Sequence, residues 1–228
     1  RPELFVTISS DVNPQIKEFE RTSTTVLGAY VGPRVSRYMA AMKTMLAEVG
    51  VKSPAHVMQA SGGAMSVDSV AARANCTIQS GPAASVLGAQ AVGAMAGEPD
   101  FVSFDMGGTS TDVSLVRNGR YSLVEETKEE GYHLRVPMID VVSIGAGGGS
   151  LAWIDSGGVL KVGPESAGAE PGPACYGTGD KPTVTDANVV LGYIDPDFFL
   201  GGEVDLDAER SRRAIENGIA KQLGMETV

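Results

Sequence analysis

The clearest chemical signal in the sequence is a run of acidic, glycine and hydroxyl residues that begins at Asp105. It reads Asp105-Met-Gly-Gly-Thr-Ser-Thr-Asp112 and follows the apolar stretch Phe101–Phe104. Successive backbone N–H groups in a tight glycine turn form a concavity that binds anions, and a carboxylate beside it can hold Mg²⁺ through water. We therefore predict a site where phosphate, metal and acid meet. The alternative is an ordinary Gly-Gly β-turn with a surface aspartate.

Each residue of this run has an expected role. We expect Asp105 and Asp112 to be the catalytic carboxylates, with Asp105 also a metal ligand. The expected nucleotide phosphate contacts are Gly107, Gly108, Thr109, Ser110 and Thr111.

A second glycine run, Gly145-Ala-Gly-Gly-Gly-Ser150, follows another predicted strand. We expect Gly147, Gly148 and Gly149 to form a wall near the nucleotide or substrate, with a purely structural turn as the alternative. The run does not match a dinucleotide fingerprint, because its sixth residue is Ser and no clear helix follows. The sequence also lacks the Gly-x-x-x-x-Gly-Lys-Ser/Thr pattern of P-loop proteins.

Three further residues are candidates for chemistry. Asp140 and Asp186 lie beside the glycine and threonine segments, and each is a candidate metal ligand or general base. The alternative for both is capping, and Thr185-Asp186 before an apolar helix fits a cap well. Cys175 could be a nucleophile, but His56 and His133 are the only histidines and neither is near it in sequence.

The elements that position these residues alternate between short strands and turns. We predict strands over 101–104, 111–116, 121–126 and 136–144. Asn118-Gly119 between the second and third is a strong hairpin signal. Residues 145–179 are rich in Gly and Pro and predict an irregular but ordered loop, and Asp205 or Asp207 is expected to cap a last helix.

The first hundred residues have the character of a mainly helical flank. Apolar spacing predicts a helix from Gly32-Pro33 to Val49 and another from Ser80 to about Ala96. A strand is expected over residues 3–9 and another over 55–60, with helical turns over 66–73. The opening Arg1-Pro2 suggests that the chain is a central piece of something longer.

Composition narrows the possible functions. The chain has 228 residues, a net charge of −10, 43% hydrophobic residues and 29 glycines. The acidic balance argues against nucleic-acid binding, and no apolar run is long enough to cross a membrane. The only two cysteines, Cys76 and Cys175, do not form a disulfide framework, so a reducing cytoplasm is expected.

The Asp105–Asp112 hairpin resembles the phosphate-binding turn of the actin, Hsp70 and sugar kinase ATPases. The segments 139–150, 162–177, 183–188 and 191–193 extend the resemblance, and together they are similar to the hydantoinase/oxoprolinase family. That family includes N-methylhydantoinase A subunits, 5-oxoprolinase and acetone carboxylase subunits. The resemblance runs along nearly the whole chain.

The resemblance implies an α/β, ribonuclease H-like ATPase lobe in which helices flank a β-meander. It implies an ATP- and Mg²⁺-dependent hydrolase that opens a cyclic amide such as hydantoin or 5-oxoproline. A ketone carboxylase subunit and a non-catalytic subunit-interaction domain are the alternatives. Residues 1–228 are then one central fragment, with a helical flank over 1–100 and the phosphate-turn meander, loop and final helix over 101–228.

The same resemblance implies what else the enzyme needs. Family members carry a first phosphate turn near their N-terminus and a Gly-Gly-Ala-Gly-Pro-type segment later, and neither occurs here. We therefore expect the isolated fragment to be inactive. The expected partners are a small cyclic amide or carbonyl substrate and a B-type subunit or further copies of the chain.

Overall fold

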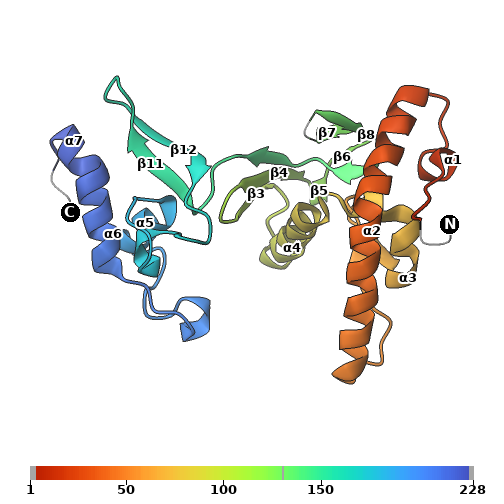
Figure 1. Cartoon of the computed structure of the whole chain (residues 1–228), viewed down its shortest axis with the longest axis horizontal. Helices are drawn as coiled ribbons and strands as arrows, with labels where there is room; N and C mark the ends of the chain where they lie inside the picture. The colour runs from red at the N-terminus through yellow and green to blue at the C-terminus, as the bar shows by residue number, and fades with distance from the viewer. Residues whose placement is uncertain (1–3, 130, 226–228) are drawn as a thin grey trace. The chain divides into compact units, whose positions relative to one another are not determined.

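Two units make up the chain in the computed structural model, which describes residues 4–129 and 131–225. One unit comprises Arg1–Ser103 and Ser114–Val141, and the other comprises Phe104–Val113 and Val142–Val228. Strands β3 (Phe101–Met106) and β4 (Thr111–Arg117) pass from one unit to the other (Figure 1). The structural division thus runs through the predicted meander, whereas the sequence pattern placed a boundary near residue 100.

The first unit is built around a long helix. That helix is α2 (Glu18–Glu48). Besides its parts of β3 and β4, the unit also contains α1 (Ser9–Val12), β1 (His56–Met58), β2 (Ala64–Ser66), α3 (Val67–Val70), the 3₁₀ helix η1 (Ala71–Thr77), α4 (Ser80–Ala96), β5 (Arg120–Tyr121), β6 (Leu123–Val124), β7 (Thr127–Glu129), β8 (Tyr132–Leu134) and β9 (Met138–Ile139). The predicted strand over 55–60, the turns over 66–73 and the helix over 80–96 are confirmed. Helix α2 lies beside η1 and α3 (Figure 1).

Helix α2 starts fifteen residues before the predicted start at Pro33. Proline usually marks a first helical turn because it lacks an N–H group, yet here Pro33 lies inside the helix. The preceding turns are threonine-rich and show little apolar spacing. Thr24 and Thr25 nevertheless fit, because their hydroxyls donate to the carbonyls of Glu20 and Arg21, each at 2.7 Å.

The strand predicted over residues 3–9 is wrong where the structure describes it, since Leu4–Ile8 is not a strand and α1 begins at Ser9. Glu3 lies outside the described residues. The partial alternation of this segment has another cause. Phe5 packs against Gly32 of α2, where an added Cβ would lie 2.2 Å from the Phe5 ring.

The central sheet has the order β10-β4-β3, with β5 also paired to β4. Asn118 and Gly119 both have positive φ, of 50° and 68°, as the predicted hairpin turn requires. The strands predicted over 121–126 and 136–144 are each broken in two. Strand β6 pairs with β9, while β5 and β10 (Val142–Ile144) both pair with β4. The chain changes partner at Ser122 and Asp140, so neither segment stays in one ladder.

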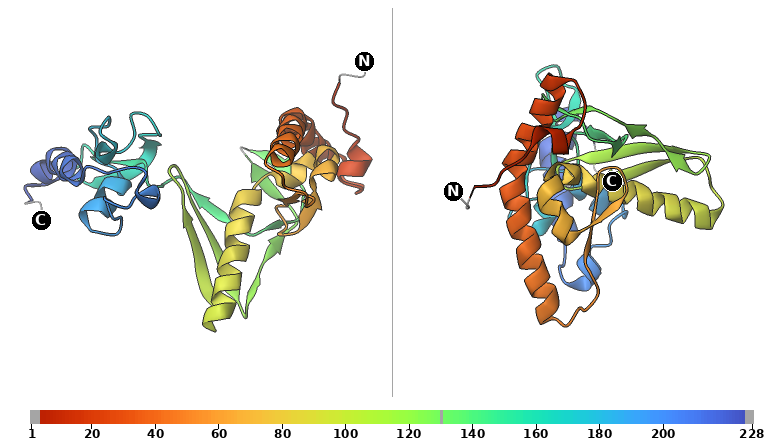
Figure 2. Two further views of the ribbon diagram at one scale, coloured as in Figure 1. Left: turned by 90° about the horizontal axis from the view of Figure 1, so that it is seen from below. Right: turned by 90° about the vertical axis from the view of Figure 1, so that its right-hand side faces the viewer.

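The second unit contains a hairpin that the sequence did not predict. Its elements are β10, β11 (Ser150–Ile154), β12 (Leu160–Ser166), η2 (Ala174–Tyr176), α5 (Val184–Val190), η3 (Leu200–Gly202), α6 (Ala208–Ile215), the π-helical turn η4 (Glu216–Ala220) and α7 (Lys221–Leu223). Strands β11 and β12 form an antiparallel hairpin, drawn with the unit in Figure 2, where an irregular loop was expected. Asp207 caps α6 by accepting from the Arg210 N–H at 2.9 Å, as predicted.

Each unit has its own buried apolar clusters. In the first unit, Met39 of α2 packs with Val67 and Val70, and Val86 of α4 packs with Val116 and Ile139. In the second unit, Cys175, Val189 and Leu206 form one cluster. Among the residues that the structure describes, no helix has both the length and the apolar content that crossing a bilayer requires.

Candidate functional site

The predicted phosphate turn joins β3 to β4 and lies at the surface of the second unit. The Gly107 N–H donates to the Ser110 carbonyl at 2.8 Å and closes the turn. Gly107, Gly108 and Thr109 are exposed. Within residues 4–129 and 131–225, no acceptor takes the N–H of Gly108 or Thr109. Two neighbouring donors at an exposed tip are the arrangement that an anion needs.

The second glycine run lies directly behind this turn. The N–H groups of Gly148 and Gly149 donate to the carbonyls of Gly107 and Gly108 at 2.9 and 2.6 Å. A Cβ on Gly147 would lie 2.6 Å from the Gly107 oxygen, so the approach requires glycine. We name residues 147–149 the glycine strip. Its contacts hold the two carbonyls inward while the tip faces solvent.

The glycine strip supports the structural alternative that the sequence left open. Its three N–H groups are already used, since Gly147 donates to the Ser150 hydroxyl at 2.8 Å and the other two donate to the turn. They are therefore not available to bind phosphate. The strand β11 that follows the strip also disagrees with a dinucleotide motif, which needs a helix there.

The hydroxyl residues of the turn divide into two kinds. Thr109 is exposed and Ser110 is half-buried, so both hydroxyls lie near the surface. Thr111 is 2% exposed and its hydroxyl donates to the Ala146 carbonyl at 2.6 Å. Its proton is therefore engaged within the fold, and Thr111 anchors the turn to the segment before the glycine strip.

The carboxylates predicted for catalysis and metal binding occupy different surroundings. Asp105 is half-buried, one residue before the end of β3. Asp112 is half-buried and accepts a hydrogen bond from the hydroxyl of Ser143, its partner on β10. Asp140 is exposed and belongs to the first unit. Within the described ranges, no three His, Cys, Asp or Glu side chains cluster as metal ligands.

Asp186 is the most completely hydrogen-bonded side chain of the second unit and is fully buried. Its carboxylate accepts from the N–H groups of Ala174, Cys175 and Thr183 at 2.9–3.1 Å and from the hydroxyls of Thr183 and Ser211 at 2.7 and 2.6 Å. Thr183 and Asp186 form a reciprocal capping box at the start of α5. The structure thus supports the capping alternative for Asp186.

These bonds also set the charge state of Asp186. Burial by itself raises the pKa of this carboxyl. The hydrogen bonds from Ser211, Thr183, Cys175 and Ala174 outweigh burial and leave the pKa below its ordinary value. The group is therefore an anion at neutral pH, held by five donors. A metal ion would have to displace these donors to reach it.

The start of α5 connects the buried Asp186 to the phosphate turn. The N–H and hydroxyl of Thr185 donate to the Gly148 carbonyl at 2.7 and 2.9 Å. Hydrogen bonds thus connect the turn through the glycine strip to Thr185, and its chain neighbour Asp186 accepts from Ser211 of α6. Ser211 lies between arginines on a polar helix, and nothing in the sequence pattern marked it as a partner of Asp186.

Cys175 is not placed for nucleophilic chemistry. It is 1% exposed, and its N–H donates to Asp186 at 2.9 Å. Burial and the neighbouring Asp186 charge raise the pKa of the Cys175 thiol to about 12. Because the thiolate is the reactive form, this residue is a poor nucleophile.

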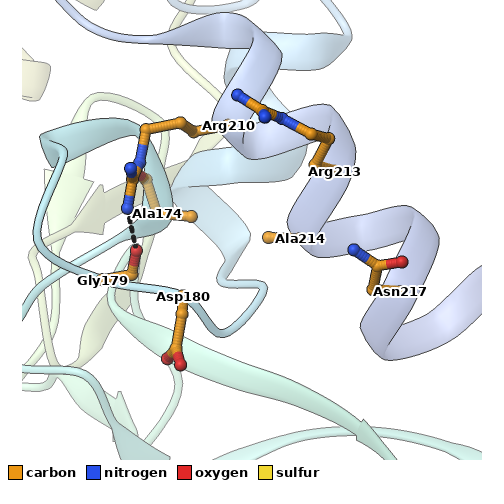
Figure 3. Close-up of a pocket in the computed structure, with 7 residues that line it drawn as sticks. All are labelled: Ala174, Gly179, Asp180, Arg210, Arg213, Ala214 and Asn217. Atoms are coloured by element: carbon orange, nitrogen blue, oxygen red, sulfur yellow. Dashed lines mark hydrogen bonds between the residues drawn. The ribbon is translucent and has the colours of Figure 1, made fainter.

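A cavity of about 230 Å³ lies beside α6, and Figure 3 shows the residues that line it. One of its two arginines, Arg210, donates through Nη2 to the Gly179 carbonyl at 3.0 Å (Figure 3). Its Nε also donates to the Ala174 carbonyl at 3.2 Å. Those bonds fasten the 174–179 loop to α6. Arg210 therefore has a structural role, which the sequence analysis did not predict.

Comparison with known proteins settles the family. The family model described as hydantoinase/oxoprolinase matches residues 21–228. The chain belongs to this family. It is 42% identical over 225 residues to the caprolactamase subunit alpha of Pseudomonas jessenii, covering 98% of this chain and 32% of that protein. The chain therefore spans about a third of this relative's length.

Two solved structures share the fold of this chain. The ATP-dependent caprolactamase of Pseudomonas jessenii aligns with a TM-score of 0.77 at 40% identity, over 99% of this chain and 33% of the other. A nucleotide-free acetone carboxylase, from work on ATP-dependent acetone carboxylation, also aligns with a TM-score of 0.77. The identity is 35%, over 96% of this chain and 31% of the other. The α/β fold expected from the sequence is confirmed at this level.

Proposed function

We propose that this chain supplies one phosphate-binding turn of the ATP site in an ATP-dependent cyclic amidase subunit. The observation that carries the proposal is the exposed tip at Gly107–Thr109. Its Gly108 and Thr109 N–H groups have no acceptor in the described residues, while the Gly107 and Gly108 carbonyls are bonded to the glycine strip. Exposed donors beside carbonyls that are already bonded suit a polyphosphate.

The finer fold assignment is part of this proposal. We place the chain in a lobe of the actin, Hsp70 and sugar kinase type, because the turn joins neighbouring strands β3 and β4 of the central sheet. A nucleotide cleft of that type has two walls, and this chain would form one. We therefore expect the isolated chain to bind ATP weakly and not to turn over.

The chemistry that fits is phosphorylation of an amide oxygen. The phosphorylated amide would have a better leaving group at nitrogen and a more electrophilic carbon. Phosphoryl transfer depends mainly on positioning and charge neutralisation. The Gly108 and Thr109 N–H groups and the Thr109 hydroxyl would hold phosphate oxygens, and Asp105 would orient the metal or the attacking group. Asp112, fixed by Ser143, would hold the return strand in place.

Asp105 also fits a magnesium ion. Mg²⁺ keeps several waters and is commonly bound through only one or two carboxylates. A half-buried Asp105 two residues before the turn meets that requirement without a cluster of acids. When bound, the ion would neutralise phosphate charge. Asp140 lies on the other unit, and the Asp186 carboxylate already accepts from five donors. Both are therefore weaker candidates than Asp105 for a ligand of this metal ion.

The substrate and partner assignments rest on the relatives. The 42% identity to a caprolactamase subunit supports a cyclic amide, such as hydantoin or 5-oxoproline. A ketone is the alternative substrate, since an acetophenone carboxylase subunit is 39% identical. The word subunit in the caprolactamase relative's name supports a B-type partner subunit. Both cysteines have free thiols, which agrees with a cytoplasmic location.

The decisive experiment is Asp105→Ala in the intact subunit, with ATP hydrolysis as the readout. We expect a fall of about a hundredfold or more, since a group that stabilises transition-state charge has an effect of that size. Asp205→Ala is the matched control, because Asp205 is an exposed carboxyl and its loss should leave hydrolysis unchanged. Wild-type hydrolysis in Asp105→Ala would remove Asp105 from the mechanism.

A thermal-shift experiment separates the enzyme proposal from the interaction-domain alternative. The 228-residue chain and the intact subunit would each be melted with ATP, with and without Mg²⁺. A metal-dependent rise in melting temperature of the intact subunit supports the ATP site. No shift in either protein would favour a domain that only binds other subunits.

A further inference from the structure

Helix α2 runs along one side of the first unit (Figure 2, right) and packs against η1, β8 and α3. Its buried residues are Thr24, Gly28, Gly32 and Met39. The opposite side of the helix is exposed. We propose that this exposed side binds an acidic helix of the partner subunit. The inference rests on the B-type partner assigned above, but not on the phosphate turn, which belongs to the other unit.

The spacing of residues along α2 defines its exposed side. Val26, Tyr30, Arg34, Arg37 and Met45 follow one another at intervals of four, four, three and eight residues. Residues at such intervals lie on one face of a helix. All five are exposed, Tyr30 to 80%, Met45 to 64% and Val26 to 58%. We name these five residues the outer stripe.

The charge of α2 is opposite to that of the chain as a whole. Residues 21–47 include four basic residues and no acidic one, whereas the chain has a net charge of −10. Lys43 pairs with Asp68 at 2.5 Å, on the side that packs against α3. Among the residues that the structure describes, Arg34 and Arg37 take part in no ion pair. Two positive charges therefore lie unneutralised in the middle of the outer stripe.

The outer stripe therefore specifies the chemistry of its partner. On the same face of α2, Glu48 follows Arg37 by eleven residues, about 16 Å along a helix that rises about 1.5 Å per residue. Exposed charges are largely screened beyond about 10 Å, so Glu48 does not neutralise the arginines. A matching surface presents carboxylates opposite the arginines and apolar groups opposite Val26, Tyr30 and Met45. Tyrosine, methionine and arginine are also the residue types enriched where protein interfaces are buried.

The same charges argue against two other occupants. If two copies of α2 paired through the outer stripe, Arg34 of one copy would meet Arg37 of the other in an antiparallel pair, and each arginine would meet its counterpart in a parallel pair. Such contacts between like charges are unfavourable. An apolar segment of the same subunit would bury both arginines without carboxylates, which is costly. A separately folded acidic partner avoids both problems, and relatives named as alpha and gamma subunits support its existence.

Photo-crosslinking identifies the occupant of the outer stripe. The photoreactive residue p-benzoylphenylalanine would replace Tyr30 in the intact subunit, co-expressed with its B-type subunit, and mass spectrometry would locate the crosslinked peptide. We expect a crosslink to an acidic helical segment of the B-type subunit. The same replacement at Arg120, an exposed residue of β5 in the first unit, is the control and should not give that crosslink.

Charge reversal tests the two arginines. The double variant Arg34→Glu, Arg37→Glu should weaken binding of the B-type subunit about tenfold or more, because carboxylates would then meet carboxylates. The double variant Arg117→Glu, Arg120→Glu makes the same change in net charge at exposed positions of β4 and β5 and should leave the affinity unchanged. Titration calorimetry measures both, and circular dichroism checks folding. If the first variant does not fold, Arg34→Gln, Arg37→Gln replaces it, with a smaller loss expected.

Several results would overturn the proposal. A crosslink from position 30 to the same subunit or to a second copy of it would identify a different occupant, and the absence of any crosslink would show that the stripe stays exposed. Equal affinities of the two double variants would remove the arginines from the interface. The ATP-induced thermal shift of the intact subunit, measured on the same preparations, reports the phosphate turn separately. Failure here is therefore distinguishable from failure of the nucleotide proposal.

Discussion

The N–H of Gly149 donates to the carbonyl of Gly108 at 2.6 Å, joining the two glycine runs of the sequence back to back. The residues lie 41 positions apart in the chain. This contact, with the parallel one from Gly148 to Gly107, makes the glycine strip a rigid support for the turn. The support explains how a glycine-rich loop can present fixed donors to a ligand.

Gly147→Ala should damage both the fold and ATP hydrolysis. The new Cβ would lie 2.6 Å from the Gly107 oxygen and 2.8 Å from the Ser110 nitrogen, and backbone atoms cannot easily move aside. We expect a loss of about 1–3 kcal/mol in the free energy of unfolding, the usual cost of overpacking. Urea denaturation measures it. Gly145→Ala is the control, because its Cβ meets nothing within 4 Å. Equal stability of the two variants would contradict a close-packed strip.

Gly108→Ala should impair nucleotide binding while sparing the fold. A Cβ at Gly108 meets no atom of the chain within 4 Å, so the unfolding free energy should change by less than about 0.5 kcal/mol. The methyl group would hinder the approach of phosphate to the exposed tip and raise the Kd for ATP about tenfold, or 1.4 kcal/mol. Calorimetry on the intact subunit measures this, with Gly88→Ala in α4 as the control. Unchanged ATP affinity would argue against contact at the tip.

Asp186→Asn should destabilise the second unit by about 3 kcal/mol or more, because hydrogen bonds to a buried charge are strong and one of the two acceptor oxygens would be replaced by an NH2 group that faces donors. Asp180→Asn, at an exposed position on the neighbouring loop, is the control. Denaturant unfolding of both variants at pH 7 provides the comparison. A loss below 1 kcal/mol for Asp186→Asn would show that an amide can replace the anion.

The same carboxyl predicts how stability depends on pH. The pKa of Asp186 in the fold is below its ordinary value, which is about 3.9 in an unfolded chain. Between the two values the unfolded chain binds more protons, so stability rises with pH there. The contribution is complete above about pH 5 and is lost as the pH falls from there through the folded value. Asp186→Asn should flatten this part of the stability curve.

Cys175 should resist alkylation in the native protein. A thiol with a pKa of about 12 contains about a thousandfold less thiolate near pH 8 than an ordinary cysteine, and burial blocks access as well. Iodoacetamide labelling followed by mass spectrometry should show Cys175 unmodified until denaturant is added. Cys175→Ala should keep ATP hydrolysis in the intact subunit. Rapid native labelling would show that the 174–179 loop opens.

The sequence by itself determined the features that depend on neighbouring residues. The Asn118-Gly119 turn, the cap at Asp207 and the strand–turn–strand around Gly107 all follow from residue types at fixed short spacing. A capping role for Asp186 was also predictable, although Thr183 and not Thr185 is the residue that begins α5 with it. The family could also be inferred, because its motifs are long runs of residues in a fixed order that can be recognised in the sequence alone. In each case, the physical cause lies within a few residues.

Tertiary structure decided the features in which distant segments compete for the same backbone groups. Helix α2 continues through Pro33 because its face packs against η1 and α3. The predicted strands around Ser122 and Asp140 break because their halves pair with different strands. Two of the three N–H groups of the glycine strip donate to the turn, and Ser211 donates to Asp186 from another helix. Hydrogen bonds and packing between residues far apart in sequence have no local signature, so only the folded chain reveals which donor meets which acceptor.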